Sequence, residues 1–220
     1  MTNTEGGAMT IEIVKAEGAR VAEAAPHIPD LVHATGPQSY DYIFGGRQLC
    51  DPFVAAAWEA PGNFFSHQQS VLAFEDGVFR GVLISHDGPD HYKLKDAVWP
   101  VALGLVEKNL ATAADIQELA ARAEIASFMN PHVPEDCSYI IVVSVPEAAR
   151  GRGAGRALME HEIARARAKG FSRVHLDVMS DNPAVGLYRA MGFEPMAETV
   201  TPIPCREHGL AMELRMMLRL

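Results

Sequence analysis

The sequence predicts a mixed α/β fold in which helices flank a sheet of both antiparallel and parallel strands. A hairpin is expected over residues 70–85, because two apolar segments flank an acidic glycine turn at residues 75–77. A strand, a helix and another strand are expected in turn over residues 138–178, and a crossover of this kind pairs the two strands in parallel. The composition, 48% hydrophobic and 21% charged, is typical of a globular protein.

Before the hairpin, the chain passes through polar, alternating and proline-containing segments, and each kind predicts a different element. A polar, glycine-rich start favours a disordered tail, alternation favours a strand, and prolines interrupt helices because they lack an amide proton. The expected elements are a tail over residues 1–8, a strand over 10–14, a helix over 22–32 interrupted near Pro26 and Pro29, and one or two helices over 39–57 broken at Gly45-Gly46 and at Asp51-Pro52.

After the hairpin, residues 87–134 are expected to form a helical insertion within a single domain that spans residues 9–220. The insertion is too short to bury a core of its own comfortably. Helices are predicted over residues 101–110 and 112–128, and Thr112 suits the N-cap of the second. The apolar face of that helix is expected to hold Ile116, Leu119, Ala123 and Phe128.

The last third of the chain predicts a regular succession of elements. Residues 138–145 are nearly all apolar or β-branched, which is typical of a strand buried on both faces. The helix that follows is expected to end at Lys169, because Gly170 suits the position after a helix. The remaining elements are a strand around residues 174–178, a helix from Asn182-Pro183 to Gly192-Phe193, and closing strands over residues 195–201 and 210–218.

Charge, hydropathy and cysteine content indicate which kinds of binding partner and which location to expect. The net charge is -9, and the excess of acidic residues lies in residues 1–130, which disfavours nucleic acid and favours a cationic small molecule or basic peptide. The same charge also suits a protein that needs only solubility. No apolar segment reaches the about 20 residues that cross a bilayer, so no membrane partner is expected. The scattered Cys50, Cys137 and Cys205 favour reduced thiols, a cytoplasmic location and no metal site.

A turn rich in arginine and glycine follows the strand over residues 138–145. Its residues are Arg150, Gly151, Arg152, Gly153, Ala154, Gly155 and Arg156. Glycine lets the backbone approach a ligand closely, and the first amides of a helix bind anions together with arginine side chains. The turn therefore predicts a pyrophosphate site. It fits neither a dinucleotide fingerprint, which needs glycine in place of Arg156, nor a P-loop, which needs Lys and then Ser or Thr after Gly155.

The turn also carries the pattern R-x-x-G-x-G at Arg150, Gly153 and Gly155, which resembles the coenzyme A signature of the GNAT superfamily of N-acetyltransferases. A later region resembles the segment after the next strand in that family: Asp181-Asn182-Pro183-Ala184, Leu187-Tyr188 and Met191-Gly192-Phe193-Glu194. The resemblance is strong over residues 138–195. It implies a mixed, mostly antiparallel sheet with one splayed parallel strand pair, flanked by helices, and acetyl-CoA as the cosubstrate.

The resemblance also implies the roles of individual residues. Backbone groups of two strand residues would bind the pantetheine arm, the amides of the turn would bind the pyrophosphate, and Tyr188 would protonate the leaving thiolate. The implied coenzyme-binding residues are Val143, Val145, Arg150, Gly151, Arg152, Gly153, Ala154, Gly155, Arg156, Asn182, Ala184 and Tyr188.

Several residues of the sequence are candidates for the base that deprotonates the acceptor amine. Family enzymes often place a glutamate near the start of the strand that begins here at residue 138, but Cys137 and Tyr139 stand on the matching face. Asp136 is the residue expected to act, and the alternatives are Glu135, Glu124, His86 and His91.

The expected activity is transfer of an acetyl group from acetyl-CoA to a primary amine. The acceptor is expected to be a small molecule with positive charge, and a protein N-terminus or lysine is the alternative. A chain that binds acyl-CoA as a sensor without catalysis is a further alternative, because the family glutamate is missing. The sequence leaves open whether the protein is a monomer or a homodimer.

Overall fold

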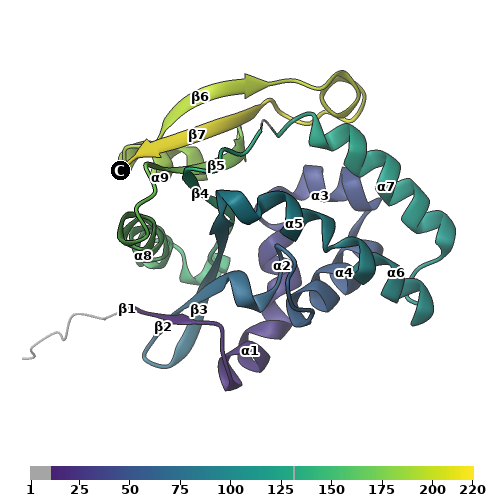
Figure 1. Ribbon diagram of the computed structural model, residues 1–220. Coiled ribbons are helices and arrows are strands. Elements are labelled where there is room, and N and C mark those ends of the chain that lie inside the picture. Colours follow the sequence, from purple (N-terminus) through teal and green to yellow (C-terminus); the bar gives the residue numbers. More distant parts are fainter. Residues whose placement is uncertain (1–10, 131) are drawn as a thin grey trace, which may run out of the picture.

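The computed structural model describes residues 11–130 and 132–220, which contain one seven-stranded sheet (Figure 1). The strand order is β1-β2-β3-β4-β5-β7-β6, and every neighbouring pair is antiparallel except β4 and β5. The strands are β1 (Ile11–Lys15), β2 (Ser70–Glu75), β3 (Val78–Asp87), β4 (Cys137–Ser144), β5 (Arg173–Met179), β6 (Glu194–Thr199) and β7 (Glu213–Arg219). The mixed fold predicted from the sequence is confirmed. The expected tail over residues 1–8 lies outside the described residues.

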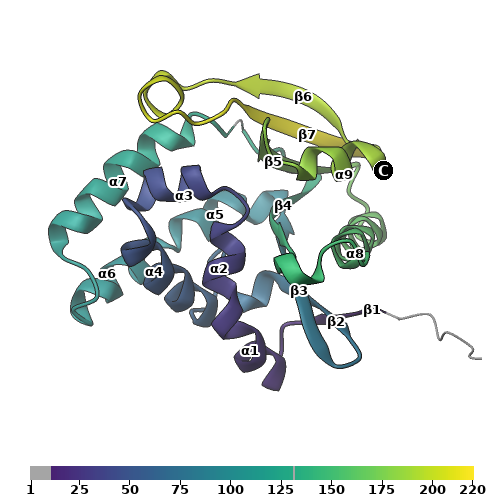
Figure 2. The same ribbon diagram turned by 180° about the vertical axis from the view of Figure 1, so that it is seen from behind.

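Helices cover both faces of the sheet, with α2 to α7 on one side and α8 on the other (Figures 1 and 2). The helices are α1 (Ala19–Ala24), α2 (Ile28–His33), α3 (Pro37–Phe44), α4 (Arg47–Glu59), α5 (His91–Asp96), α6 (Trp99–Glu107), α7 (Ala113–Ser127), α8 (Ala154–Ala168) and α9 (Ala184–Ala190). One apolar core joins the sheet to α2, α4, α6 and α7, and another joins it to α8 and α9. Among the described helices, none is long and apolar enough to span a bilayer.

Short turns complete the chain, and the local chemistry explains two of the expected boundaries. The turns are 3-10 helices at Ala25–His27, His67–Gln69, Gly88–Asp90 and Glu147–Ala149, and a π turn at Ile203–Glu207. In the hairpin of β2 and β3, Asp76 and Gly77 have φ of 51° and 76°, the positive values that a tight turn between twisted strands requires. At the start of α7, the amide of Asp115 donates to Thr112 Oγ1 at 3.1 Å, so Thr112 is the N-cap as predicted.

Several details of the helices differ from the prediction, among them α5, which was not expected, and the chain at Pro52 and at Phe128. Pro52 does not break a helix, because α4 continues through it. Proline removes one amide donor, here the one that would reach the carbonyl of Gln48, and Gln48 is an exposed residue near the start of the helix. Phe128, expected on the buried face of α7, is 72% exposed because it lies just beyond the helix, and Met129 occupies the buried position instead.

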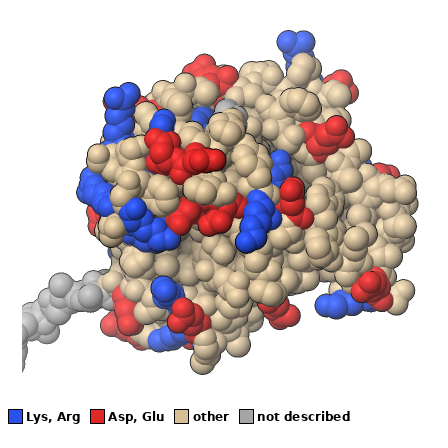
Figure 3. Space-filling model, viewed as in Figure 1, with Lys and Arg blue, Asp and Glu red and all other residues tan. Residues whose placement is uncertain are grey.

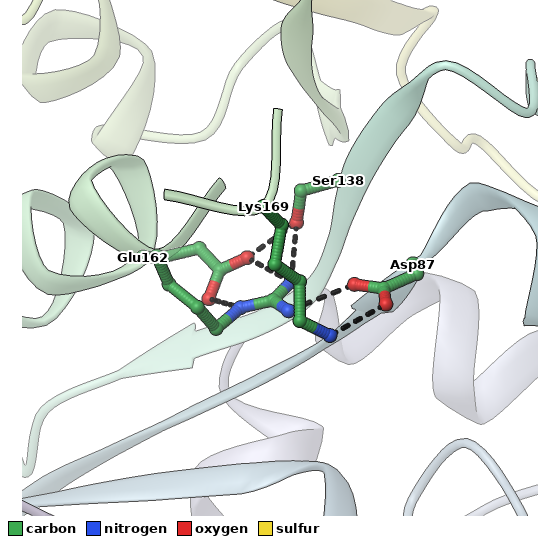
Figure 4. A network of polar contacts seen from close by, with 5 residues as sticks. Asp87, Ser138, Glu162 and Lys169 are labelled. Atoms are coloured by element: carbon green, nitrogen blue, oxygen red, sulfur yellow. Dashed lines mark hydrogen bonds and ion pairs between the residues drawn. The ribbon is translucent and has the colours of Figure 1, made fainter. Parts of the chain in front are cut away.

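A network of charged side chains fastens α8 to the start of β4 (Figure 4). This closed cluster consists of Asp87, Ser138, Glu162, Arg165 and Lys169. Arg165 donates to Asp87 and to Glu162, each at 2.8 Å, and Lys169 donates to Asp87 at 2.7 Å. Burial raises the pKa of Asp87, but the hydrogen bonds from Lys169 and Arg165 outweigh it and hold that pKa below its usual value. Two cations therefore match two carboxylates in this cluster.

Candidate active site

The two parallel strands separate halfway along their length. Residues 137–140 of β4 pair with residues 173–176 of β5, and no pairing follows. Beyond that point β4 stays with β3, and β5 stays with β7. Ile141 is an extra residue of β4 opposite β3, since Ile140 pairs with Ser85 and Val142 with Ile84. Such a bulge bends a strand. The result is a wedge between residues 141–144 and residues 177–179.

The N-terminus of α8 opens beside this wedge. Gly151 and Gly153 have φ of 77° and 91°, a conformation that side chains disfavour, so the turn requires glycine at these two positions. The first hydrogen bond of the helix runs from the Ala157 amide to the Gly153 carbonyl at 2.9 Å, and Gly153, at the N-cap, has no side chain that could cap the helix. The amides of residues 154–156 therefore point out of the helix without intrahelical partners, as an anion site requires.

A cavity of about 1110 Å³ joins the wedge to this helix end. Most of the residues expected to bind the coenzyme line it: Val143, Val145, Arg150, Gly151, Gly153, Ala154, Gly155, Arg156, Asn182, Ala184 and Tyr188. Arg152 is not among the lining residues, because its guanidinium lies 3.5 Å from the buried carboxylate of Glu75. A Cβ added at Gly155 would lie in ordinary van der Waals contact with Val145 and Leu187, each at 3.7 Å. The structure brings the other predicted residues together, and their roles stay predictions.

Tyr188 and Asn182 approach the cavity from α9 and the turn before it. Tyr188 is buried beside Phe193, and burial raises the pKa of its phenol. Asn182 Oδ1 accepts from the Ala184 amide at 2.9 Å, in the turn just before α9. Asn182 Nδ2 also donates to the Thr35 carbonyl at 2.9 Å, and this second bond ties α9 to the segment after α2.

The acidic residues that the sequence offered as the base lie away from the cavity. Asp136 does not line the cavity. It bonds Ser172 and Arg173, and the hydrogen bond from Arg173 lowers its pKa, which argues against the base role expected for it. Glu124 and Glu135 are exposed and do not line the cavity either.

The two histidine candidates are also weak bases in this fold. His86 and His91 lie together, with 2.9 Å between Nε2 of the first and Nδ1 of the second, and His91 lines the cavity. Burial lowers the pKa of His86 to about 3 and that of His91 to about 4. Both rings are therefore neutral near pH 7 and hold a proton poorly.

A second charged cluster faces the cavity, and the sequence did not point to it. This open cluster consists of Asn130, Tyr139, Asp177, Glu213 and Arg215. Asp177 accepts from the Tyr139 hydroxyl at 2.6 Å, from Arg215 Nη2 at 2.7 Å and from Asn130 at 3.1 Å. Arg215 also bonds Asp177 through Nε and is 2% exposed.

Glu213 is the carboxylate of the open cluster whose acidity is strongly perturbed. It begins β7, lines the cavity and accepts from Asn130 Nδ2 at 3.2 Å. Burial, and then the negative charge of Asp177, raise the pKa of Glu213 to about 8. A carboxyl group with this pKa can exchange a proton at neutral pH.

Comparison with known proteins agrees with the family resemblance. Residues 46–193 match the family described as Acetyltransferase (GNAT) family. A stretch of 62 residues is 44% identical to mycothiol acetyltransferase of Jonesia denitrificans, and this match covers 28% of the chain but only 20% of that relative.

Solved structures share the fold. An N-acetyltransferase from Staphylococcus aureus Mu50 has a TM-score of 0.66 at 16% identity, covering 94% of this chain and 100% of its own. A structure described as an acetyltransferase has a TM-score of 0.62 at 21% identity, covering 94% of this chain and 98% of its own. At these identities the likeness shows the fold alone.

Proposed function

This chain belongs to the acetyltransferase (GNAT) family, and from that premise we propose that it transfers an acetyl group from acetyl-CoA to a primary amine of a small molecule. The observation that carries the proposal is the shared cavity. It joins an uncapped helix end, suited to a pyrophosphate, to a wedge between two strands, suited to an extended arm.

The coenzyme would lie along residues that already surround the cavity. The amides of residues 154–156 and the side chains of Arg150 and Arg156 would hold its pyrophosphate. Backbone groups of Val143 and Val145 would bind the pantetheine arm in the wedge. The bound coenzyme supplies an activated thioester, so the chain itself must position the amine and manage the protons.

Proton management sets two tasks for the side chains. An alkylammonium with a pKa of about 10.4 is only about one part in a thousand neutral at pH 7, so a group must take its proton before attack. The leaving sulfur needs a proton in return, and Tyr188 is the phenol that lines the cavity on the α9 side. Tyr188 is accordingly the proposed acid.

A small-molecule acceptor is favoured by the walls of the cavity. Helices α3, α5, α6 and α7 contribute lining residues on the side of the sheet opposite α8, and many of these are aromatic. They include Tyr40, Tyr42, Phe44, Tyr92 and Trp99. Such walls suit an amine with an apolar body. On the face shown in Figure 3, acidic and basic side chains are interspersed.

The test is release of coenzyme A thiol from acetyl-CoA over a panel of amines. The panel should hold arylalkylamines, polyamines and peptides with free N-termini. We expect turnover to be highest with small amines that carry an apolar body. Preference for the peptides would instead indicate a protein acceptor. Tight binding of acetyl-CoA with no turnover on any amine would contradict the enzymatic role and indicate a sensor.

A further inference from the structure

The open cluster is one positive charge short. Among the described residues that contact its two carboxylates, Arg215 is the cation, and it binds Asp177 through both Nε and Nη2. The closed cluster, whose two carboxylates do not line this cavity, holds two cations for two carboxylates. A buried carboxylate without a matching cation is costly, so it either keeps a proton or takes a cation from elsewhere.

The two carboxylates of the open cluster are not equivalent. Asp177 accepts hydrogen bonds from Tyr139, Arg215 and Asn130, which occupy most of its acceptor positions. Glu213 accepts from Asn130 through Oε1, and among the described residues no donor to its Oε2 is recorded. Glu213 also lines the cavity. The carboxylate with free acceptor positions is therefore Glu213.

We infer that Glu213 binds the ammonium group of the acceptor and takes its proton, so that the acceptor itself supplies the missing cation. This inference rests on the proposed function, since it names a catalytic residue of the same site. Asp177, Arg215 and Asn130 position Glu213 rather than react. The acceptor class that follows is a primary amine that arrives protonated, in preference to a neutral amine or an alcohol.

The protons balance in the following way. One proton of the ammonium goes to a carboxylate oxygen of Glu213, and the neutral nitrogen attacks the thioester carbonyl carbon. As the new C–N bond forms, the C–S bond breaks and its electron pair stays on sulfur. The sulfur takes a proton from Tyr188, and the second proton lost by nitrogen restores that phenol. Glu213 returns its proton to solvent after the product leaves.

The pH dependence follows from the groups around Glu213. Asp177 on β5, Arg215 on β7, Tyr139 on β4 and Tyr40 on α3 are the titratable groups that interact with it. Burial and Asp177 raise its pKa to about 8, and it can accept a proton only when ionised. For the wild type, kcat/KM for an amine should therefore rise with pH through about 8 and level off until the amine itself titrates.

The experiment compares Glu213→Gln with Glu198→Gln, the same substitution at an exposed position on β6. The substrates are 2-phenylethylamine and its β,β-difluoro analogue, a much weaker base of similar shape. For 2-phenylethylamine at pH 7, Glu213→Gln should lower kcat/KM by about 10²- to 10⁴-fold and abolish the inflection near 8. The loss should be much smaller for the fluorinated amine, which needs no base at that pH. Glu198→Gln should behave as wild type.

The outcomes separate this inference from the proposed function. Equal losses for the two amines, or a wild-type pH profile in Glu213→Gln, would overturn the role of Glu213 while leaving the acetyltransferase activity in place. Failure of the wild type to bind acetyl-CoA, or to acetylate any amine, would overturn the proposed function itself. If Glu213→Gln does not fold, the pH profiles of kcat/KM of the wild type with the two amines decide. An inflection that shifts with the pKa of the amine, with none near 8 that both amines share, would contradict a base supplied by the protein.

Discussion

The two charged clusters on either side of the parallel strand pair differ in charge balance and in what faces them. The closed cluster joins α8 to the paired half of β4 and matches two cations with two carboxylates. The open cluster lies toward the splayed half, faces the cavity and holds one guanidinium for two carboxylates. A balanced buried network fixes structure, whereas an unbalanced one keeps a titratable group available for a ligand.

Removing Arg165 should have the largest effect on stability. Arg165→Met leaves Glu162, which is 1% exposed, and Asp87 without their main cation, and breaking a buried pair in this way costs about 3 to 5 kcal/mol. Urea denaturation measures the loss. The control is Arg167→Met on the exposed side of the same helix, which should stay within about 0.5 kcal/mol of the wild type. Equal stability of the two variants would show that the closed cluster does not anchor α8.

Glu213→Gln should stabilise the protein, and the gain in the free energy of unfolding should depend on pH. The folded protein keeps the proton of Glu213 up to about pH 8, whereas the unfolded chain releases it near pH 4.3. Wild-type stability therefore falls as pH rises between these values, and the variant lacks this loss. The free energy of unfolding of the variant minus that of the wild type should grow by roughly 2 to 4 kcal/mol from pH 5 to pH 8. A difference that does not change with pH would mean that Glu213 titrates normally.

Tyr188→Phe tests a side chain of the α9 wall of the cavity that is proposed to act in catalysis and not in stability. Tyr188 is buried, lines the cavity and belongs to neither cluster. Its hydroxyl is therefore available for catalysis and is not used to stabilise a cluster. We expect kcat to fall about 100-fold, at the low end of what a general acid contributes. Calorimetric titration should give the same affinity for acetyl-CoA as in the wild type. Full activity at every pH would remove Tyr188 from the mechanism.

Lys169→Ala should have the smallest effect, although Lys169 belongs to the closed cluster. Its side chain is 50% exposed, so water already solvates much of its charge. Loss of its ion pair with Asp87 should cost less than about 1 kcal/mol in urea denaturation. A cost equal to that of Arg165→Met would mean that the two cations act as one unit.

Features that depend on neighbours in the chain were predictable from the sequence. The Asp-Gly hairpin turn, the cap at Thr112 and the end of α8 before Gly170 each follow from a few adjacent residues. The turn from Arg150 to Arg156 was also recognisable, because its glycines and arginines are contiguous. All of these features appear in the structure at or near the predicted positions.

The open cluster could not be predicted, because its members are far apart in the chain. Asp177 and Arg215 look like the solvent-facing residues of alternating strands until the segment that includes Asn130 is seen to cover them. Glu213 is one of many acidic residues, and only its burial beside Asp177 distinguishes it. The ion pair of Asp136 could not be predicted for the same reason, since its partner Arg173 lies 37 residues away in the chain.

Binding of acetyl-CoA at the start of α8 is the premise of every role assigned to the cavity, and a matched pair of variants tests it most directly. Gly153 and Gly170 lie at opposite ends of α8, both with positive φ, so valine strains the backbone similarly at each. In calorimetric titration with acetyl-CoA, Gly170→Val should bind like the wild type and Gly153→Val should show no binding. Wild-type affinity in Gly153→Val, or no binding of acetyl-CoA by the wild type, would contradict a coenzyme site at this helix end.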